Sequence, residues 1–185
     1  MTLFTEHSYS RVMVFIDYRN VYESTTMMGE DVRLDLYRLT QILVASRDLV
    51  GAYVFDARKR IPDKGDTTLM MHDRLRDQGF RVIARESIVY RDGKAEQKEV
   101  DVSLACEMLE HALLNHYDVA IVVSGDRDFV PAIQRVQAAG KRVEVAAFED
   151  VYNDECKRAA DVYYVLDKMP IMSMSSSTDN LGVDY

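Results

Sequence analysis

The chain has 185 residues, of which 48% are hydrophobic, and a formal net charge of −8. This length and composition are typical of one globular domain with its own core. No apolar run is long enough to cross a membrane and no basic, apolar leader opens the chain, so we expect a cytoplasmic protein without a membrane partner. Cys106 and Cys156 have neither Cys-x-x-Cys spacing nor a histidine cluster beside them, so neither a disulfide framework nor a zinc site is suggested.

Residues 11–168 carry a repeating strand and helix pattern, between a flexible segment at 1–10 and a polar, disordered tail at 169–185. Apolar runs predict strands at Val12–Ile16, Val50–Phe55, Phe80–Ala84, Asp118–Val123, Arg142–Ala147 and Val162–Val165. Apolar residues three or four apart predict helices that start near Asn20 and cover Arg33–Ser46, Asp66–Gln78, Glu99–Asn115, Phe129–Ala139 and Asn153–Ala160. Ile88–Tyr90 predicts a short hairpin that turns at Asp92–Gly93. The alternation predicts an α/β fold, a three-layer α/β/α Rossmann-like sandwich with a mainly parallel sheet.

Two of the predicted strands lead directly into acidic residues. Asp17 follows Val12–Ile16, and Ile121–Val123 runs into Asp126 and Asp128. Open α/β sheets bind ligands beyond the carboxyl ends of their strands, so these side chains are expected at the functional edge of the sheet. Asp126 and Asp128, taken alone, fit a helix cap or turn as well as a metal site.

A third acidic segment makes the metal site the favoured interpretation. Asp101 shares a helical stripe with Leu104 and Met108, although an acid in a first helical turn is also stabilised by the helix dipole alone. Four carboxylates in one cleft repel one another unless a cation neutralises them. Oxygen ligands suit Mg²⁺ or Mn²⁺, and the predicted ligands are Asp17, Asp101, Asp126 and Asp128.

Four segments of the chain carry a family resemblance, in order and with compatible spacing. They are Phe15–Asn20, Lys98–Ala105, Val123–Ile133 and Gly140–Val143. Together they resemble the NYN domain of the PIN-like nuclease superfamily, and most closely its LabA-like branch. The resemblance covers Arg11 to Leu166, which makes it far more specific than any single motif.

The resemblance implies a metal-dependent ribonuclease with a Rossmann-like, PIN-like sheet and RNA as its partner. It implies that the catalytic and metal-binding acids are Asp17, Asp101, Asp126 and Asp128. Three further residues match supporting positions of the pocket: Asn20, Ser124 and Lys98. Asn20 would orient Asp17 or a substrate phosphate, and Ser124 would hydrogen-bond a carboxylate or the scissile group. A solvated lysine ahead of a helix is the plainer interpretation of Lys98.

The chain also departs from the family pattern. Tyr18 and Arg19 stand where the family often has glycine, and they add bulk and charge at the mouth of the cleft. Glu107 fills another acidic position of the family pattern. It falls outside the helical stripe of Asp101, so we treat it as a reserve candidate.

Basic residues near the acidic motifs are the candidates for RNA contact, because phosphate contacts supply most non-specific affinity for nucleic acid. Arg58, Lys59, Arg60 and Lys64 follow the predicted strand Val50–Phe55, whose end shares the edge of Asp17. The predicted RNA contacts are Arg19, Arg58, Lys59, Arg60 and Arg127. A solvated charged loop is the alternative for the basic run.

Two other functions stay open. The chain could be a catalytically weak or inactive RNA-binding or regulatory protein that acts through a partner or as a homodimer. It could also be another Rossmann-like enzyme acting on small phosphate esters. A phosphatase of the haloacid dehalogenase type would need a second Asp two residues after Asp17, where Arg19 stands, and a Toprim nuclease would need Glu in place of Asp17.

Overall fold

The computed structural model describes residues 11–29, 32–58, 67–86, 88–89, 95–96, 98–151 and 153–174. Its centre is a six-stranded sheet in the order β4-β3-β1-β7-β8-β9, in which every pairing is parallel. The strands are β1 (Arg11–Asp17), β3 (Asp48–Arg58), β4 (Arg81–Glu86), β7 (Val119–Val123), β8 (Arg142–Ala147) and β9 (Val162–Val165). β1 and β7 are the two central strands and are almost wholly buried, as their apolar runs predicted.

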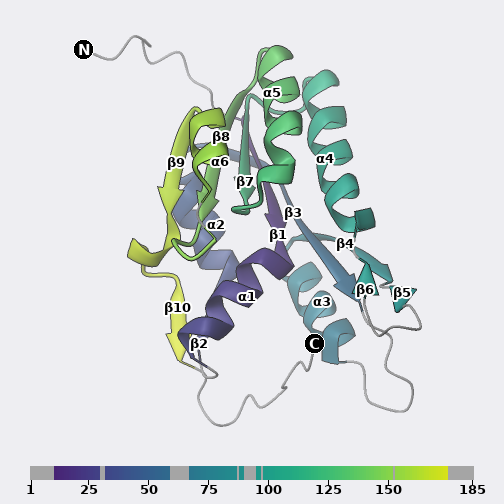
Figure 1. Cartoon of the computed structure of the whole chain (residues 1–185), viewed down its shortest axis with the longest axis vertical. Helices are drawn as coiled ribbons and strands as arrows, with labels where there is room; N and C mark the ends of the chain where they lie inside the picture. Colours follow the sequence, from purple (N-terminus) through teal and green to yellow (C-terminus); the bar gives the residue numbers. More distant parts are fainter. Residues whose placement is uncertain are drawn as a thin grey trace.

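Helices cover both faces of this sheet (Figure 1). On one face α1 (Tyr18–Met28), α2 (Leu36–Val44) and α3 (Thr67–Asp77) pack against the side chains of Val12, Val14 and Ile16. On the other face α4 (Lys98–Leu113) and α5 (Val130–Ala138) pack against Met13 and Phe15, with α6 (Asp154–Ala159) beside α5. Short 3-10 helices are η1 (Arg127–Phe129) and η2 (Leu166–Lys168). The predicted three-layer α/β/α sandwich is confirmed.

The path of the chain places a crevice between the two central strands. From β1 the chain moves outward to β3 and β4, with α1, α2 and α3 on one face. It then crosses by α4 on the other face to β7, and continues outward in the opposite direction to β8 and β9. The carboxyl ends of β1 and β7 therefore flank the topological switch point, where open α/β sheets bind their ligands.

Two small antiparallel sheets accompany the large one. β5 (Ile88–Val89) pairs with β6 (Ala95–Glu96), which confirms the predicted hairpin, while its predicted turn lies outside the described residues. β2 (Val32–Leu34) pairs with β10 (Met172–Met174).

This second pairing corrects two predictions. The helix predicted at Arg33–Ser46 begins only at Leu36, because Asp35 caps it: its Oδ1 accepts a hydrogen bond from the Arg38 backbone N at 2.9 Å. The tail predicted to be disordered from residue 169 instead contains the buried Ile171 and strand β10.

Segment 1–10 and the chain after Met174 lie outside the described residues. Within the described part of the chain, no helix has the length and apolar character that crossing a membrane requires.

Candidate functional site

Asp17 is the last residue of β1 and lies 6% exposed at the switch point. It is the N-cap of α1, where its Oδ1 accepts a hydrogen bond from the Asn20 backbone N at 3.3 Å. Its other oxygen, Oδ2, accepts a hydrogen bond from the Ser124 hydroxyl at 3.0 Å. The predicted bond from Ser124 to a carboxylate is thus present, and it joins the ends of the two central strands.

The loop after β7 is held by a short series of hydrogen bonds. The Gly125 backbone N donates to the Asn20 side-chain oxygen at 3.0 Å, and the Asp126 backbone N donates to the Ser124 hydroxyl oxygen at 3.2 Å. Asp126 then caps η1, since its Oδ1 accepts from the Asp128 backbone N at 2.9 Å. Asn20 therefore contacts Asp17 through its backbone N, in line with the expected orienting role, and its side chain also positions this loop.

Two neighbours fix the loop from its other side. A Cβ at Gly125 would stand 2.2 Å from the backbone oxygen of Val151, so only glycine allows the loops after β7 and β8 to approach so closely. The buried Cys156 thiol of α6 donates to the Asp126 backbone oxygen at 3.1 Å. Nothing in the sequence marks Cys156 for this contact, because it depends on the packing of α6 against η1.

Asp101 reaches the site from a third element, the first turn of α4. It is half-buried, and burial raises the pKa of its carboxyl. The charges of Asp126 and Asp128 raise this pKa further, while the charge of Arg19 lowers it. Asp101 is thus within electrostatic range of the β7 loop and of α1, as the metal-site hypothesis requires.

Burial has a marked effect on the pKa of Asp17. Its pKa is raised to about 7, mainly by burial and further by the negative charges of Asp101 and Asp126. The hydrogen bonds from Asn20 and Ser124 lower the pKa, but they do not offset the burial. This carboxyl therefore keeps its proton to a much higher pH than an ordinary aspartate does.

The basic residues named in the sequence analysis lie on several elements of the fold. Arg19 is exposed on α1 and its Nε contacts Glu23 Oε1 at 2.6 Å, and Arg127 is exposed at the start of η1. Arg58 ends β3 and Lys98 begins α4. Lys59, Arg60 and Lys64 lie outside the described residues.

The structure adds information on two further residues, Arg85 and Glu107. Arg85 of β4 was missed, although its Nε donates to the Ser103 hydroxyl at 3.4 Å, two residues along α4 from Asp101. The rule that identified Asp17, which selects residues at the carboxyl end of a parallel strand, would have found it. Glu107, the reserve acid, has its Oε2 at 3.5 Å from His111 Nε2, further along α4.

The side chains offer the chemistry that a hard divalent cation needs, because carboxylate, amide and hydroxyl oxygens lie at the carboxyl ends of β1 and β7. Among the described residues, no three His, Cys, Asp or Glu side chains stand close enough together to share one ion. Mg²⁺ usually takes only one or two carboxylates directly and keeps several waters. The negative charges that Asp17 and Asp101 feel from the other acids, with the raised pKa values of both, therefore fit such an ion bound partly through water.

Comparison with known proteins identifies the fold and the family. A crystal structure of a protein of unknown function from Vibrio parahaemolyticus superposes with a TM-score of 0.70 at 23% sequence identity, covering 90% of this chain and 98% of that one. At this identity the likeness shows the fold. No curated protein matches the chain. Residues 11–167 match the NYN domain, so the chain belongs to the NYN domain family of the PIN-like nuclease superfamily.

Proposed function

We propose that this protein is a divalent-metal-dependent ribonuclease that hydrolyses RNA phosphodiester bonds in the crevice between β1 and β7. The proposed catalytic and metal-binding acids are Asp17, Asp101, Asp126 and Asp128, and the proposed cofactor is Mg²⁺ or Mn²⁺. Family membership supports a nuclease-like fold, and RNA as substrate agrees with the expected cytoplasmic location. Assignment to the LabA-like branch stays a prediction.

One observation carries the proposal. Three elements that are far apart in the sequence, β1, α4 and the loop after β7, bring their acidic residues within electrostatic range of one another at the switch point. A fold gains no stability from such an arrangement, because like charges in a partly buried crevice repel and raise each other's pKa. A cation that binds there would remove the repulsion, which makes a binding role the best physical reason for the cluster.

The metal ion, the polar residues and the arginines would each have a separate role in the reaction. Mg²⁺ or Mn²⁺, when bound, supplies an activated water and stabilises the charge that develops on the scissile phosphate. Ser124 and Asn20 keep Asp17 and the Asp126 loop in place through the hydrogen bonds given above. Arg19 acts electrostatically on Asp101, Arg85 contacts Ser103 two residues along α4 from Asp101, and Arg127 stands between Asp126 and Asp128 in the chain. These three arginines would be suited to hold the RNA phosphates that flank the site.

A second function is favoured by a different observation. Because no three described acidic, histidine or cysteine side chains share a single ion, the chain could bind RNA without cutting it. It would then be an RNA-binding or regulatory protein, alone or as a homodimer. Such a protein would hold RNA equally well in the presence of a chelator, and no condition would produce cleavage.

The deciding experiment is cleavage of a labelled, partly single-stranded RNA with Mn²⁺, with Mg²⁺ and with chelator. The ribonuclease requires cutting that depends on metal and is lost in Asp126→Asn, whose amide can still cap η1. Asp73→Asn, at an exposed position on α3, is the matched control and should cut like the wild type. If folded protein fails to cut several RNAs under every metal condition, the binding function replaces the ribonuclease.

A further inference from the structure

Helix α4 carries apolar side chains on two opposite sides. The inner side faces the sheet with four core residues, which are Val100, Leu104, Met108 and Ala112. An α-helix turns by about 100° per residue, which puts a second apolar set roughly 150° away from the first. We call this second set the outer stripe, and its residues are Val102, Cys106, Leu109 and Leu113. A helix on the surface of a domain needs only one apolar side, so the outer stripe indicates a further contact.

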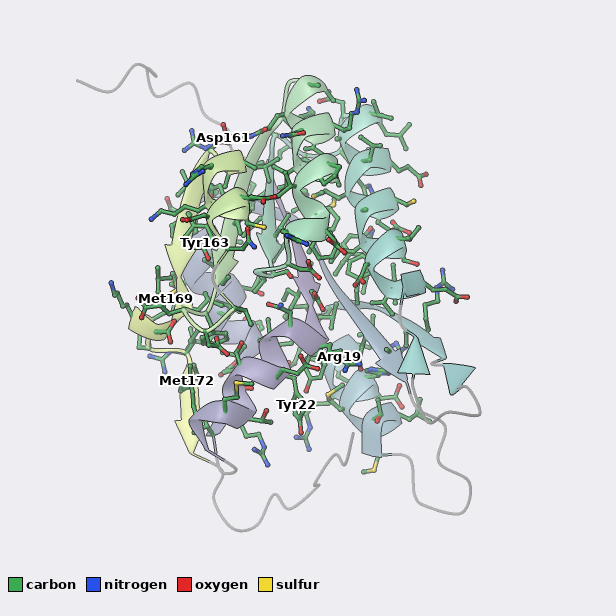
Figure 2. All side chains as sticks on the ribbon, viewed as in Figure 1. Arg19, Tyr22, Asp161, Tyr163, Met169 and Met172 are labelled. Carbon is green, nitrogen blue, oxygen red and sulfur yellow. The ribbon has the colours of Figure 1, made fainter. Side chains whose placement is uncertain are left out.

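The outer stripe is largely open to solvent in the single chain. Val102 is 60% exposed and Leu113 is 68% exposed, while Cys106 is exposed and Leu109 is half-buried. α4 lies at the edge of its helix layer, with α5 on one side (Figure 1). Figure 2 shows side chains of α4 that project into the space on its other side. Single exposed apolar residues are common, but a continuous apolar stripe along a whole helix marks an interaction surface.

The spacing of the outer stripe is that of a helix that packs against another helix. Its members follow one another at intervals of four, three and four residues. This is the heptad spacing of a coiled coil, in which every such residue turns toward the partner helix. A small ligand would not need apolar residues at this interval along the full length of a helix. We therefore expect the outer stripe to pack against a second helix.

The outer stripe is complementary to itself. If two copies of α4 lie antiparallel about a two-fold axis at its middle, Val102 meets Leu113 of the second copy. In the same arrangement Cys106 meets Leu109 of the second copy. Each contact joins a smaller side chain to a larger one, which allows the two rows to interdigitate. A parallel pair would instead place each residue against its own copy and lose this match.

The charges at the two ends of α4 favour the same arrangement. The first turn carries Glu99 and Asp101, the last turn carries His111, and exposed His116 follows the helix. Antiparallel copies bring the acidic end of one helix to the end of the other that carries the histidines. The two helix dipoles then also oppose each other, which is favourable. A parallel pair would place acid beside acid.

We propose that the outer stripe is the interface of an antiparallel homodimer, so that the partner of this surface is a second copy of the chain. The 16 residues of α4 give an interface about 24 Å long. A single helix pair of this length buries less area than the roughly 800 Å² per partner of a standard interface. The dimer is therefore weak, with a Kd on the order of 10 to 100 µM.

Sedimentation equilibrium of the full chain tests the proposal. The wild type should change from monomer to dimer between about 5 µM and about 500 µM. Val102→Lys and Leu113→Glu each place a charge against an apolar side chain of the second copy, so each should weaken association at least about tenfold. Both positions are exposed in the single chain, so both variants should keep the Tm of the wild type.

A mixture of the two variants tests the antiparallel arrangement. Each mixed dimer contains one contact between the introduced lysine and the introduced glutamate, and one unchanged contact between Val102 and Leu113. The mixture should therefore associate about tenfold more tightly than either variant alone. In a parallel dimer the two introduced charges would lie at opposite ends of the interface and would not meet.

The matched control is Met70→Lys, which introduces a charge at a 56% exposed apolar position on α3. This variant should dimerise like the wild type. A wild type that stays monomeric up to about 500 µM would overturn the proposal. Two further results would do the same: unweakened association of Val102→Lys or Leu113→Glu, or a mixture that associates no more tightly than its components.

Sedimentation in chelator and without RNA keeps this result separate from the proposed function. A monomeric wild type that cuts RNA with metal would reject the homodimer and keep the ribonuclease. A dimer that depends on the outer stripe, without cleavage under any metal condition, would keep the homodimer and reject the ribonuclease.

Discussion

Two buried carboxylates in the same sheet have opposite surroundings. Glu144, in the middle of β8, is 3% exposed, and Arg47 donates to both of its oxygens at 2.9 and 3.0 Å. The Tyr164 hydroxyl donates to Glu144 at 3.1 Å as well. Asp17, at the end of β1, is 6% exposed, receives neutral donors from Asn20 and Ser124, and feels the negative charges of Asp101 and Asp126.

The difference separates a structural acid from a candidate functional one. Taking a carboxylate out of water costs several kcal/mol. The fold offsets this cost at Glu144 with a paired arginine, which also ties the end of α2 to β8. At Asp17 the charged groups that raise the pKa have the same sign as the carboxylate itself. Burial alone is therefore a poor marker of function, whereas burial beside like charges at a strand end is a better one.

The largest expected effect comes from removing the partner of the structural acid. Arg47→Ala leaves buried Glu144 with its longer contact to Arg142, at 3.4 Å, and without the two hydrogen bonds from Arg47, and we expect it to lower the free energy of unfolding by about 3 kcal/mol. Urea unfolding followed by circular dichroism measures this change. Arg38→Ala, at an exposed position on α2, is the control and should change stability by less than about 0.5 kcal/mol. Similar stabilities of the Arg47 and Arg38 variants would remove the contrast between the two acids.

The second effect is a pH dependence that arises from Asp17. Its pKa rises from 3.8 in the unfolded chain to about 7 in the folded one. Between these values the unfolded state has lost its proton and the folded state keeps it, so stability falls as pH rises through this window and levels off above it. In chelator, we expect the wild type to lose roughly 2 kcal/mol of unfolding free energy between pH 5 and pH 8.

Asp17→Asn is the variant that isolates this dependence. It cannot ionise, so most of the fall between pH 5 and pH 8 should vanish, with a smaller remainder from Asp101, whose pKa is raised in the same direction. Asp118→Asn provides a contrast of opposite sign, because Arg11 lowers the pKa of Asp118 and that stability is lost as pH falls. A slope that is the same in wild type and Asp17→Asn would show that Asp17 ionises freely in the fold.

The smallest effect is stabilisation by metal. At ten times its dissociation constant, Mg²⁺ or Mn²⁺ should raise the free energy of unfolding of the wild type by about 1.4 kcal/mol, seen as a higher Tm at pH 8. Asp17→Asn and Asp126→Asn should lose this response. Glu144→Gln should keep it despite its lower starting stability, because Glu144 already has its cation in Arg47. An equal metal response in all four proteins would place the bound ions elsewhere.

The sequence predicts the elements of the sheet well because buried parallel strands are local apolar runs. β8 at Arg142–Ala147 and β9 at Val162–Val165 have the predicted bounds. β2 was missed because Leu34 continues the apolar spacing of the helix that follows it. Its pairing with β10 joins segments almost 140 residues apart, as in Arg33 with Ser173, and no local pattern encodes such a contact.

The positions of the acidic residues in the fold are predictable to the same extent. Asp17, Asp126 and Asp128 follow from the rule about strand ends, and the stripe of α4 suggests Asp101. Contacts that depend on packing between separate elements do not follow from that rule. These are the bond from Gly125 to Asn20, the thiol of Cys156 on the Asp126 carbonyl, and the position of Arg85 beside Ser103.

Strand β10 also belongs to the folded domain, so it sets a limit on how far the domain can be shortened at its C-terminal end. The family match stops at residue 167, whereas Ile171 is fully buried and its carbonyl accepts from the Asp35 backbone N at 3.0 Å. A protein shortened to the matched residues would open the apolar core under α1 and α2 and leave β2 without its partner. The matched segment is thus shorter than the unit that folds, and the inactivity of a fragment trimmed to residues 11–167 would say nothing about the acids of the crevice.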